Sequence, residues 1–137
     1  MKKVLSILII LLVTTSCTSS KVSLKSDSLS SDEINSQKIL GHWGEGDSPY
    51  GISAFQKGGV YKAWMYKSSK KEKLIIEMEA KWWIKDGQLY NELTEIYPPL
   101  PGFEIGRIVI DQIVDISENE MTLIDEEGQK YKNIRLK

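Results

Sequence analysis

Apolar and polar residues alternate along the segment 74–85 of the chain. The even-numbered positions are all apolar, whereas the odd-numbered positions include charged residues such as Glu77 and Lys81. A period of two places successive side chains on opposite faces of a β-strand, so this segment is predicted to have one dry and one solvated face. Asp86 and Gly87 follow directly. Asp-Gly suits the type I′ turn of a hairpin, because both central residues need positive φ.

Similar segments recur at short, even spacing in the rest of the chain, and turn residues such as those at 57–59 and 118–120 separate them. The pattern predicts eight strands, at residues 39–43, 51–55, 60–66, 73–85, 88–97, 106–117, 121–125 and 129–136. Short connections between sequential strands indicate an antiparallel up-and-down meander. Eight such strands are enough to close a small all-β barrel that has no exposed edge.

The strand at 106–117 is expected to face the core with its even-numbered apolar residues, and Gln112 interrupts that face. These residues are Ile108, Ile110, Val114 and Ile116. The same alternation places Asp111 and Asp115 together on the solvated face. Neither carboxylate is therefore assigned a functional role from the sequence.

The residues before the first strand carry helix signals. Ser30 and Glu33 have the spacing of a capping box, and Asp32 and Glu33 are favourable near a helix start. A short amino-terminal helix is therefore expected ahead of the barrel. The serine-rich stretch 17–31 contains few large apolar residues and is predicted to be a flexible tether, with the barrel domain at 32–137.

The chain begins with two lysines and an apolar run from Val4 to Val13, followed by small residues up to Cys17. This order is typical of a secretory signal peptide, and the run is too short for a membrane-spanning helix, which needs about 20 residues. A cysteine directly after such a segment resembles the lipobox of bacterial lipoproteins. The resemblance implies a lipoprotein signal peptide at 1–16, cleavage before Cys17, and lipid attachment to its sulfur. Because Cys17 is the single cysteine, no internal disulfide competes for it.

Lipidation of Cys17 predicts a cell-envelope protein that is held on a membrane surface without crossing it. Thr18 is not the aspartate that retains many lipoproteins at the inner membrane. The expected location is thus the periplasmic face of the outer membrane in a host with two membranes, or the outer face of the cytoplasmic membrane in a host with one. Lys2 and Lys3 leave with the signal peptide, so the 18 basic and 19 acidic residues become a net charge of −3. This charge argues against nucleic acid as a partner.

Gly41 and Trp43 open the first predicted strand, just after the helix, and residues 55–61 read FQKGGVY. These stretches resemble the Gly-x-Trp signature of the lipocalin and calycin families and the F-x-x-x-G-x-Y stretch of small bacterial lipocalin-like domains. The resemblance covers about residues 39–137 and implies a small lipocalin-like barrel. It further implies that Trp43 plugs the closed end and that Arg135, on the last strand, packs over it. A guanidinium can stack on an indole while it donates to backbone carbonyls.

The aromatic residues Trp64, Tyr66 and Trp82 are candidates for the lining of the barrel interior. A lining of this kind suits a small apolar ligand. The alternative is a filled barrel, because the interior of a small eight-stranded barrel is just wide enough for side chains.

Trp83 points away from Trp82 by alternation and is a candidate for a surface that contacts a protein partner, unless the helix covers it. Leu100 and Phe103 lie on a proline-rich stretch that is expected to be an extended loop. This loop is interpreted as a lid over the barrel mouth, a contact for another protein, or a rigid crossover.

Catalysis is not predicted. His42 is the single histidine and is expected to point outward, opposite Trp43. No metal site or cofactor is expected from the remaining residues. The first hypothesis is therefore a lipid-anchored lipocalin-like barrel that binds a small apolar ligand. The alternative is a structural or adaptor lipoprotein that contacts an envelope protein through Trp83 and the proline-rich loop.

Overall fold

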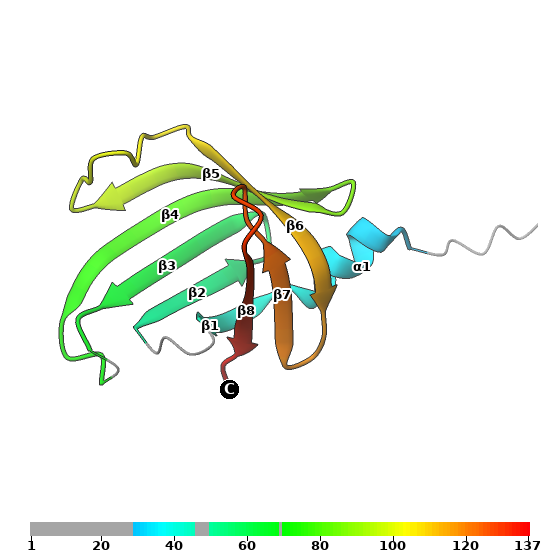
Figure 1. The fold of residues 1–137 in the computed structure, drawn as a ribbon, viewed down its shortest axis with the longest axis horizontal. Coiled ribbons are helices and arrows are strands. Elements are labelled where there is room, and N and C mark those ends of the chain that lie inside the picture. Colours follow the sequence, from blue (N-terminus) through cyan, green and yellow to red (C-terminus); the bar gives the residue numbers. More distant parts are fainter. Residues whose placement is uncertain (1–28, 46–49, 69) are drawn as a thin grey trace, which may run out of the picture.

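The computed structural model describes residues 29–45, 50–68 and 70–137, which form one short helix and eight strands (Figure 1). The elements are α1 Ser31–Lys38, β1 Gly41–Glu45, β2 Gly51–Gln56, β3 Val60–Tyr66, β4 Leu74–Lys85, β5 Gln88–Tyr97, β6 Ile108–Ile116, β7 Glu120–Ile124 and β8 Lys130–Arg135. The number and order of the predicted strands are confirmed. The expected signal peptide, Cys17 and most of the expected tether lie outside the described residues. Among the described residues, no helix is long and apolar enough to cross a bilayer.

Each strand pairs antiparallel with the next, and β8 returns to β1, so the sheet closes into a barrel. The closing pair places Trp43 opposite Arg135. Closure satisfies the backbone groups that an edge strand would expose. All strand pairings of the described residues lie between residues 41 and 135, so this unit holds its own sheet and core.

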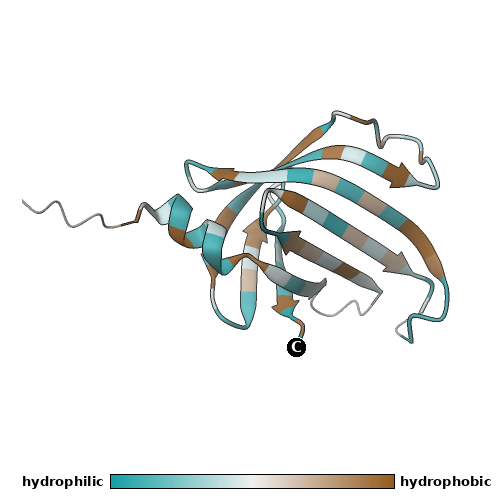
Figure 2. Ribbon diagram, turned by 180° about the vertical axis from the view of Figure 1, so that it is seen from behind, coloured by the Kyte–Doolittle hydropathy of each residue, from teal (hydrophilic) through white to brown (hydrophobic). Residues whose placement is uncertain are grey.

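The local signals for the turn and the helix are both confirmed. Asp86 and Gly87 have φ values of 53° and 73°, as a type I′ turn requires. Ser30 and Glu33 form the capping box at the start of α1. The carboxylate of Asp32 accepts hydrogen bonds from the backbone N–H groups of Asp86 and Gly87 at 2.7 and 2.9 Å, so the helix start is fixed to the β4–β5 turn. No residue of α1 is buried, and Figure 2 shows this helix as largely hydrophilic.

The core gathers side chains from most strands and from the residue after the helix. Its buried members are Ile39, Trp43, Phe55, Trp82, Leu89, Ile116, Met121 and Leu123. Trp82 meets Phe55 edge-on at 5.5 Å between ring centroids, and Phe55 also packs against Tyr61. Both contacts lie on the inner face of the sheet and join β2, β3 and β4.

The predicted inner face of β6 is wrong along most of the strand. Ile108 and Val114 are 44% and 47% exposed, whereas Asp111 is 6% exposed. The pairing register of β6 with β7 shifts between Ile113 and Asp115. A bulge of one residue reverses which side chains face inward, so the odd-numbered residues point inward before it and Ile116 points inward after it.

Candidate functional site

Trp43 of β1 is fully buried in the core of the barrel. Its indole N–H donates to the carbonyl of Ile39 at 2.7 Å. The guanidinium carbon of Arg135 lies 4.1 Å from the centre of the Trp43 ring. The structure therefore brings Trp43 and Arg135 together in a cation–π contact.

Arg135 also connects two further chain segments, the end of α1 with the residues after it and the turn between β6 and β7, to this stack. Its guanidinium donates to the backbone carbonyls of Lys38, Leu40 and Glu118. Gly41 has a φ of +124°, and a Cβ atom there would lie 2.8 Å from Nη1 of Arg135. A residue without a side chain at position 41 therefore lets the guanidinium reach the carbonyls beneath it.

Trp64 and Tyr66 do not line the interior. Ala63 faces the cavity described below, so alternation places both aromatic residues on the outer face of β3. The indole N–H of Trp64 donates to Glu77 at 3.1 Å on this face. Lys62 has the same parity and forms an ion pair with Glu79 there. Lys62, which has the same parity as Trp64 and Tyr66, was the sequence signal for an outer face.

Trp82 lies on the inner face, where it is 8% exposed. Its indole N–H donates to the carbonyl of Gln56 at 3.1 Å, and its ring packs against Phe55. Trp82 thus belongs to the packed core. It does not line the cavity itself but contacts Phe55, which does.

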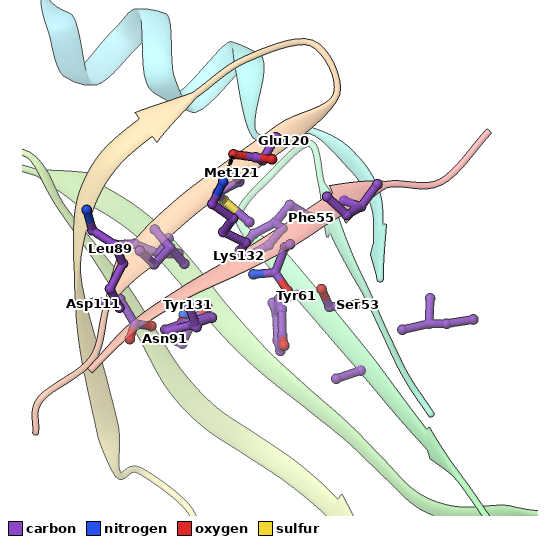
Figure 3. Close-up of a pocket in the computed structure, with 16 residues that line it drawn as sticks. Ser53, Phe55, Tyr61, Leu89, Asn91, Asp111, Glu120, Met121, Tyr131 and Lys132 are labelled. Atoms are coloured by element: carbon purple, nitrogen blue, oxygen red, sulfur yellow. Dashed lines mark hydrogen bonds and ion pairs between the residues drawn. The ribbon is translucent and has the colours of Figure 1, made fainter. Parts of the chain in front are cut away.

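A cavity of about 820 Å³ occupies the inner side of the barrel (Figure 3). Much of its wall is apolar and consists of Phe55, Ala63, Leu89, Met121 and Leu123. The volume falls within the range of about 300–1,000 Å³ that is typical of small-molecule sites. Side chains therefore do not fill this interior completely.

Polar groups gather on one side of the cavity, where Figure 3 shows Asp111, Asn91 and Tyr131 near one another. The Tyr131 hydroxyl donates to the Asp111 carboxylate. Burial raises the pKa of Asp111, and the nearby carboxylates of Asp125 and Glu126 raise it further. Burial and the Asp111 charge raise the pKa of Tyr131 well above its ordinary value, so this hydroxyl keeps its proton.

Asn91 has a buried side-chain oxygen, Oδ1, without a hydrogen-bond partner in the described structure. Such a group costs free energy unless a donor reaches it. Neither Asn91 nor Asp111 was a candidate from the sequence. The bulge between Ile113 and Asp115 changes which side chains of β6 face inward, and Asp111 is one of them. No local sequence pattern reveals this bulge.

Two solved structures share this architecture. A lipocalin-like protein from Bacteroides uniformis matches with a TM-score of 0.52 and 16% sequence identity, and the match covers 72% of this chain and 99% of that chain. An uncharacterized protein from Bacteroides eggerthii matches with a TM-score of 0.54, at the same identity and the same coverage. The fold is lipocalin-like. No family model and no curated protein matches the chain.

A second hollow of about 260 Å³ adjoins the first in the lipocalin-like barrel, and the two share Tyr61, Asn91 and Asp111 as lining residues. Phe103 of the loop between β5 and β6 also lines this hollow, and it is 47% exposed. Leu100 of the same loop is half-buried. Phe103 therefore lies at the edge of a hollow, in the position that the lid interpretation of this loop requires.

Trp83 lies on the outer face of the lipocalin-like barrel. It stacks on Tyr90 with ring centroids 5.2 Å apart and an angle of 8° between the planes. Ser36 and Leu40, at the end of α1 and just beyond it, line the same shallow groove as Trp83. The indole is thus half-buried and already has one stacking partner.

His42 is exposed, as alternation predicted. Within the described residues, no three His, Cys, Asp or Glu side chains are placed to hold a metal ion. The polar groups of the large cavity are the main feature of the interior that packing does not explain.

Proposed function

We propose that this protein is a lipid-anchored lipoprotein of the cell envelope, whose lipocalin-like barrel binds a small, largely apolar ligand without catalysing a reaction. The single observation that carries the binding part is the cavity of about 820 Å³ with its apolar wall. Burial of apolar ligand surface contributes roughly 25 cal/mol per Å², so a ligand that covers this wall has a substantial driving force.

The binding part is tested with residues 18–137, which contain the whole closed barrel. Apolar fluorescent probes are titrated while tryptophan emission is recorded, since Trp82 contacts the cavity-lining Phe55. A saturable change that is lost in Trp82→Phe supports binding in the interior. Trp64→Phe, on the outer face, is the matched control and is expected to keep the change. A barrel that binds no probe overturns the proposal.

The lipid anchor at Cys17 rests on the amino-terminal sequence. The test is expression of the full chain and of Cys17→Ser in a host with two membranes, followed by fractionation. The wild-type protein is expected in the outer-membrane fraction with a diacylglycerol-modified amino-terminal peptide in its mass spectrum. A Cys17→Ser variant that stays in that fraction, or an unmodified wild-type peptide, contradicts lipid anchoring.

The adaptor alternative is favoured by one observation, the exposed apolar residues at the end of β5 and in the loop after it. Tyr97, Phe103 and Ile105 are 73%, 47% and 62% exposed. In this alternative the loop contacts an envelope protein. Crosslinking in intact cells from position 105 distinguishes the two functions: one specific protein adduct supports the adaptor, and no adduct together with probe binding supports the ligand carrier.

A further inference from the structure

Two hydrogen-bond acceptors at the polar side of the large cavity, the carboxylate of Asp111 and Oδ1 of Asn91, could take a donor from a ligand. An ionised Asp111 carboxylate offers only acceptors, and the Tyr131 hydroxyl gives its single proton to that carboxylate. The buried Oδ1 of Asn91 adds a further acceptor that has no partner. Since Asn91 and Asp111 line both hollows, these acceptors stand where the two spaces meet.

When Asp111 is ionised, its negative charge has no ion-pair partner in the described structure. Asp111 is 6% exposed and forms no ion pair with a lysine or arginine of the described chain. The charged side chains that affect the pKa of Asp111, Asp125 and Glu126, are also acidic. A buried carboxylate in these surroundings is costly to the empty barrel.

None of the cations near the cavity forms an ion pair with Asp111 in the described structure. Lys130 and Lys132 flank Tyr131 on β8 and border the cavity; Lys132 pairs with Glu120 at 2.7 Å, and neither lysine forms an ion pair with Asp111 in the described structure. Arg107, at the edge of the second hollow, donates to the carbonyl of Gly102 at 2.9 Å and is 4.0 Å from Glu126. A cationic ligand would therefore bring Asp111 a positive charge that these contacts do not supply.

We propose that the cavity binds amphipathic amines, that is, small apolar molecules with one ammonium group that donates to Asp111 and to Oδ1 of Asn91. This inference rests on the proposed function and names its ligand class. The ammonium supplies several donors and one positive charge, whereas the tail lies on the wall formed by Leu89, Met121 and Leu123. A carboxylate head group adds a second negative charge beside Asp111 and leaves Asn91 unsatisfied. An alcohol has one donor and no charge.

The first test uses three probes with the same chain, n-octylamine, n-octanol and n-octanoate, measured by calorimetry with residues 18–137 at pH 7.5. The amine is expected to bind roughly tenfold or more tightly than the alcohol, with the acid weakest. Octanol or octanoate that binds as tightly as octylamine overturns the inference and leaves the proposed function standing. Failure of all three probes overturns both.

The second test compares Asp111→Asn with Asp115→Asn, which removes the same charge from an exposed position of the same strand. Asp111→Asn keeps the side-chain shape and is expected to weaken octylamine binding roughly tenfold or more, and octanol binding by less than about threefold. Asp115→Asn is expected to change neither. Equal losses in the two variants would indicate general electrostatic attraction and overturn the inference. If Asp111→Asn proves unfolded by circular dichroism, the comparison of probes on the wild-type barrel decides.

Discussion

Replacing Arg135 with methionine is expected to destabilise the barrel strongly, although the residue is the last residue of β8. Methionine has a similar length and can still cover the Trp43 ring. It removes the cation–π contact at 4.1 Å and the donors to the carbonyls of Lys38, Leu40 and Glu118. The loss therefore reports how much the charge and its hydrogen bonds stabilise the packing around Trp43.

The magnitude follows from the exposure of these contacts. A cation–π contact is worth about 0.5–1 kcal/mol at an exposed site and more when desolvated. The bond to Leu40 is partly buried, whereas the bonds to Lys38 and Glu118 are exposed and contribute less. Together these terms predict a loss of about 3 kcal/mol, which corresponds to a decrease in Tm of roughly 15 °C for a domain of about 100 residues.

Urea unfolding monitored by circular dichroism measures this loss. Arg107→Met is the matched control, because the Arg107 side chain is 51% exposed and its ion pair spans 4.0 Å; its expected cost is under about 1 kcal/mol. Arg135→Lys should lose most of the same energy as Arg135→Met, because one ammonium cannot stack on the indole and reach three carbonyls. A loss below about 1 kcal/mol for Arg135→Met would refute the inference that Arg135 stabilises the packing around Trp43.

Three further outcomes are expected. Gly41→Ala should lower the free energy of unfolding by about 2 kcal/mol in urea titrations, because its Cβ would lie 2.8 Å from the guanidinium at a φ of +124°. Ala63→Phe should block the cavity and abolish probe binding in fluorescence titrations, whereas Val114→Phe on the exposed side of β6 should not. The pKa of Asp111 is raised above 3.8 by burial, so the folded protein holds this proton more tightly than the unfolded chain does. The contribution of Asp111 to stability therefore falls as pH rises from about 4 toward the folded pKa, and Asp111→Asn should gain stability over the wild type across that interval in melts at stepped pH.

The strands were predictable because each depends on a few neighbouring residues. Alternation in β4, the Asp86-Gly87 turn and the capping box at Ser30 are all local, and each local preference agrees with the final fold. The lipocalin-like architecture follows from eight short antiparallel strands with short connections, which have few ways to avoid an exposed edge.

The inner face of a strand is predictable only when its large apolar residues occupy either the odd-numbered or the even-numbered positions, and not both. In β3, both parities contain large residues, and only the charge of Lys62 distinguishes the outer face that carries Trp64. In β6, Val109 and Ile113 compete with Ile108 and Val114, and the bulge lets both parities contribute to the interior. Which parity faces the core then depends on pairing with β7, and the sequence of β6 by itself does not contain that information.

The two positions that the sequence did not predict are also those where the interior contains polar groups in place of apolar side chains. Asp111 occupies an inward position that an apolar residue would fill at lower cost, and Asn91 beside the same hollow has an acceptor without a donor. If Asp111 served stability alone, Asn at that position would weaken the empty barrel. If it serves a cationic ligand, the variant is more stable when empty, by about 1 kcal/mol at pH 7, and gains less stability when octylamine is added. Thermal melts of both proteins with and without octylamine separate these cases, because a purely structural carboxylate predicts a lower Tm for the variant under every condition.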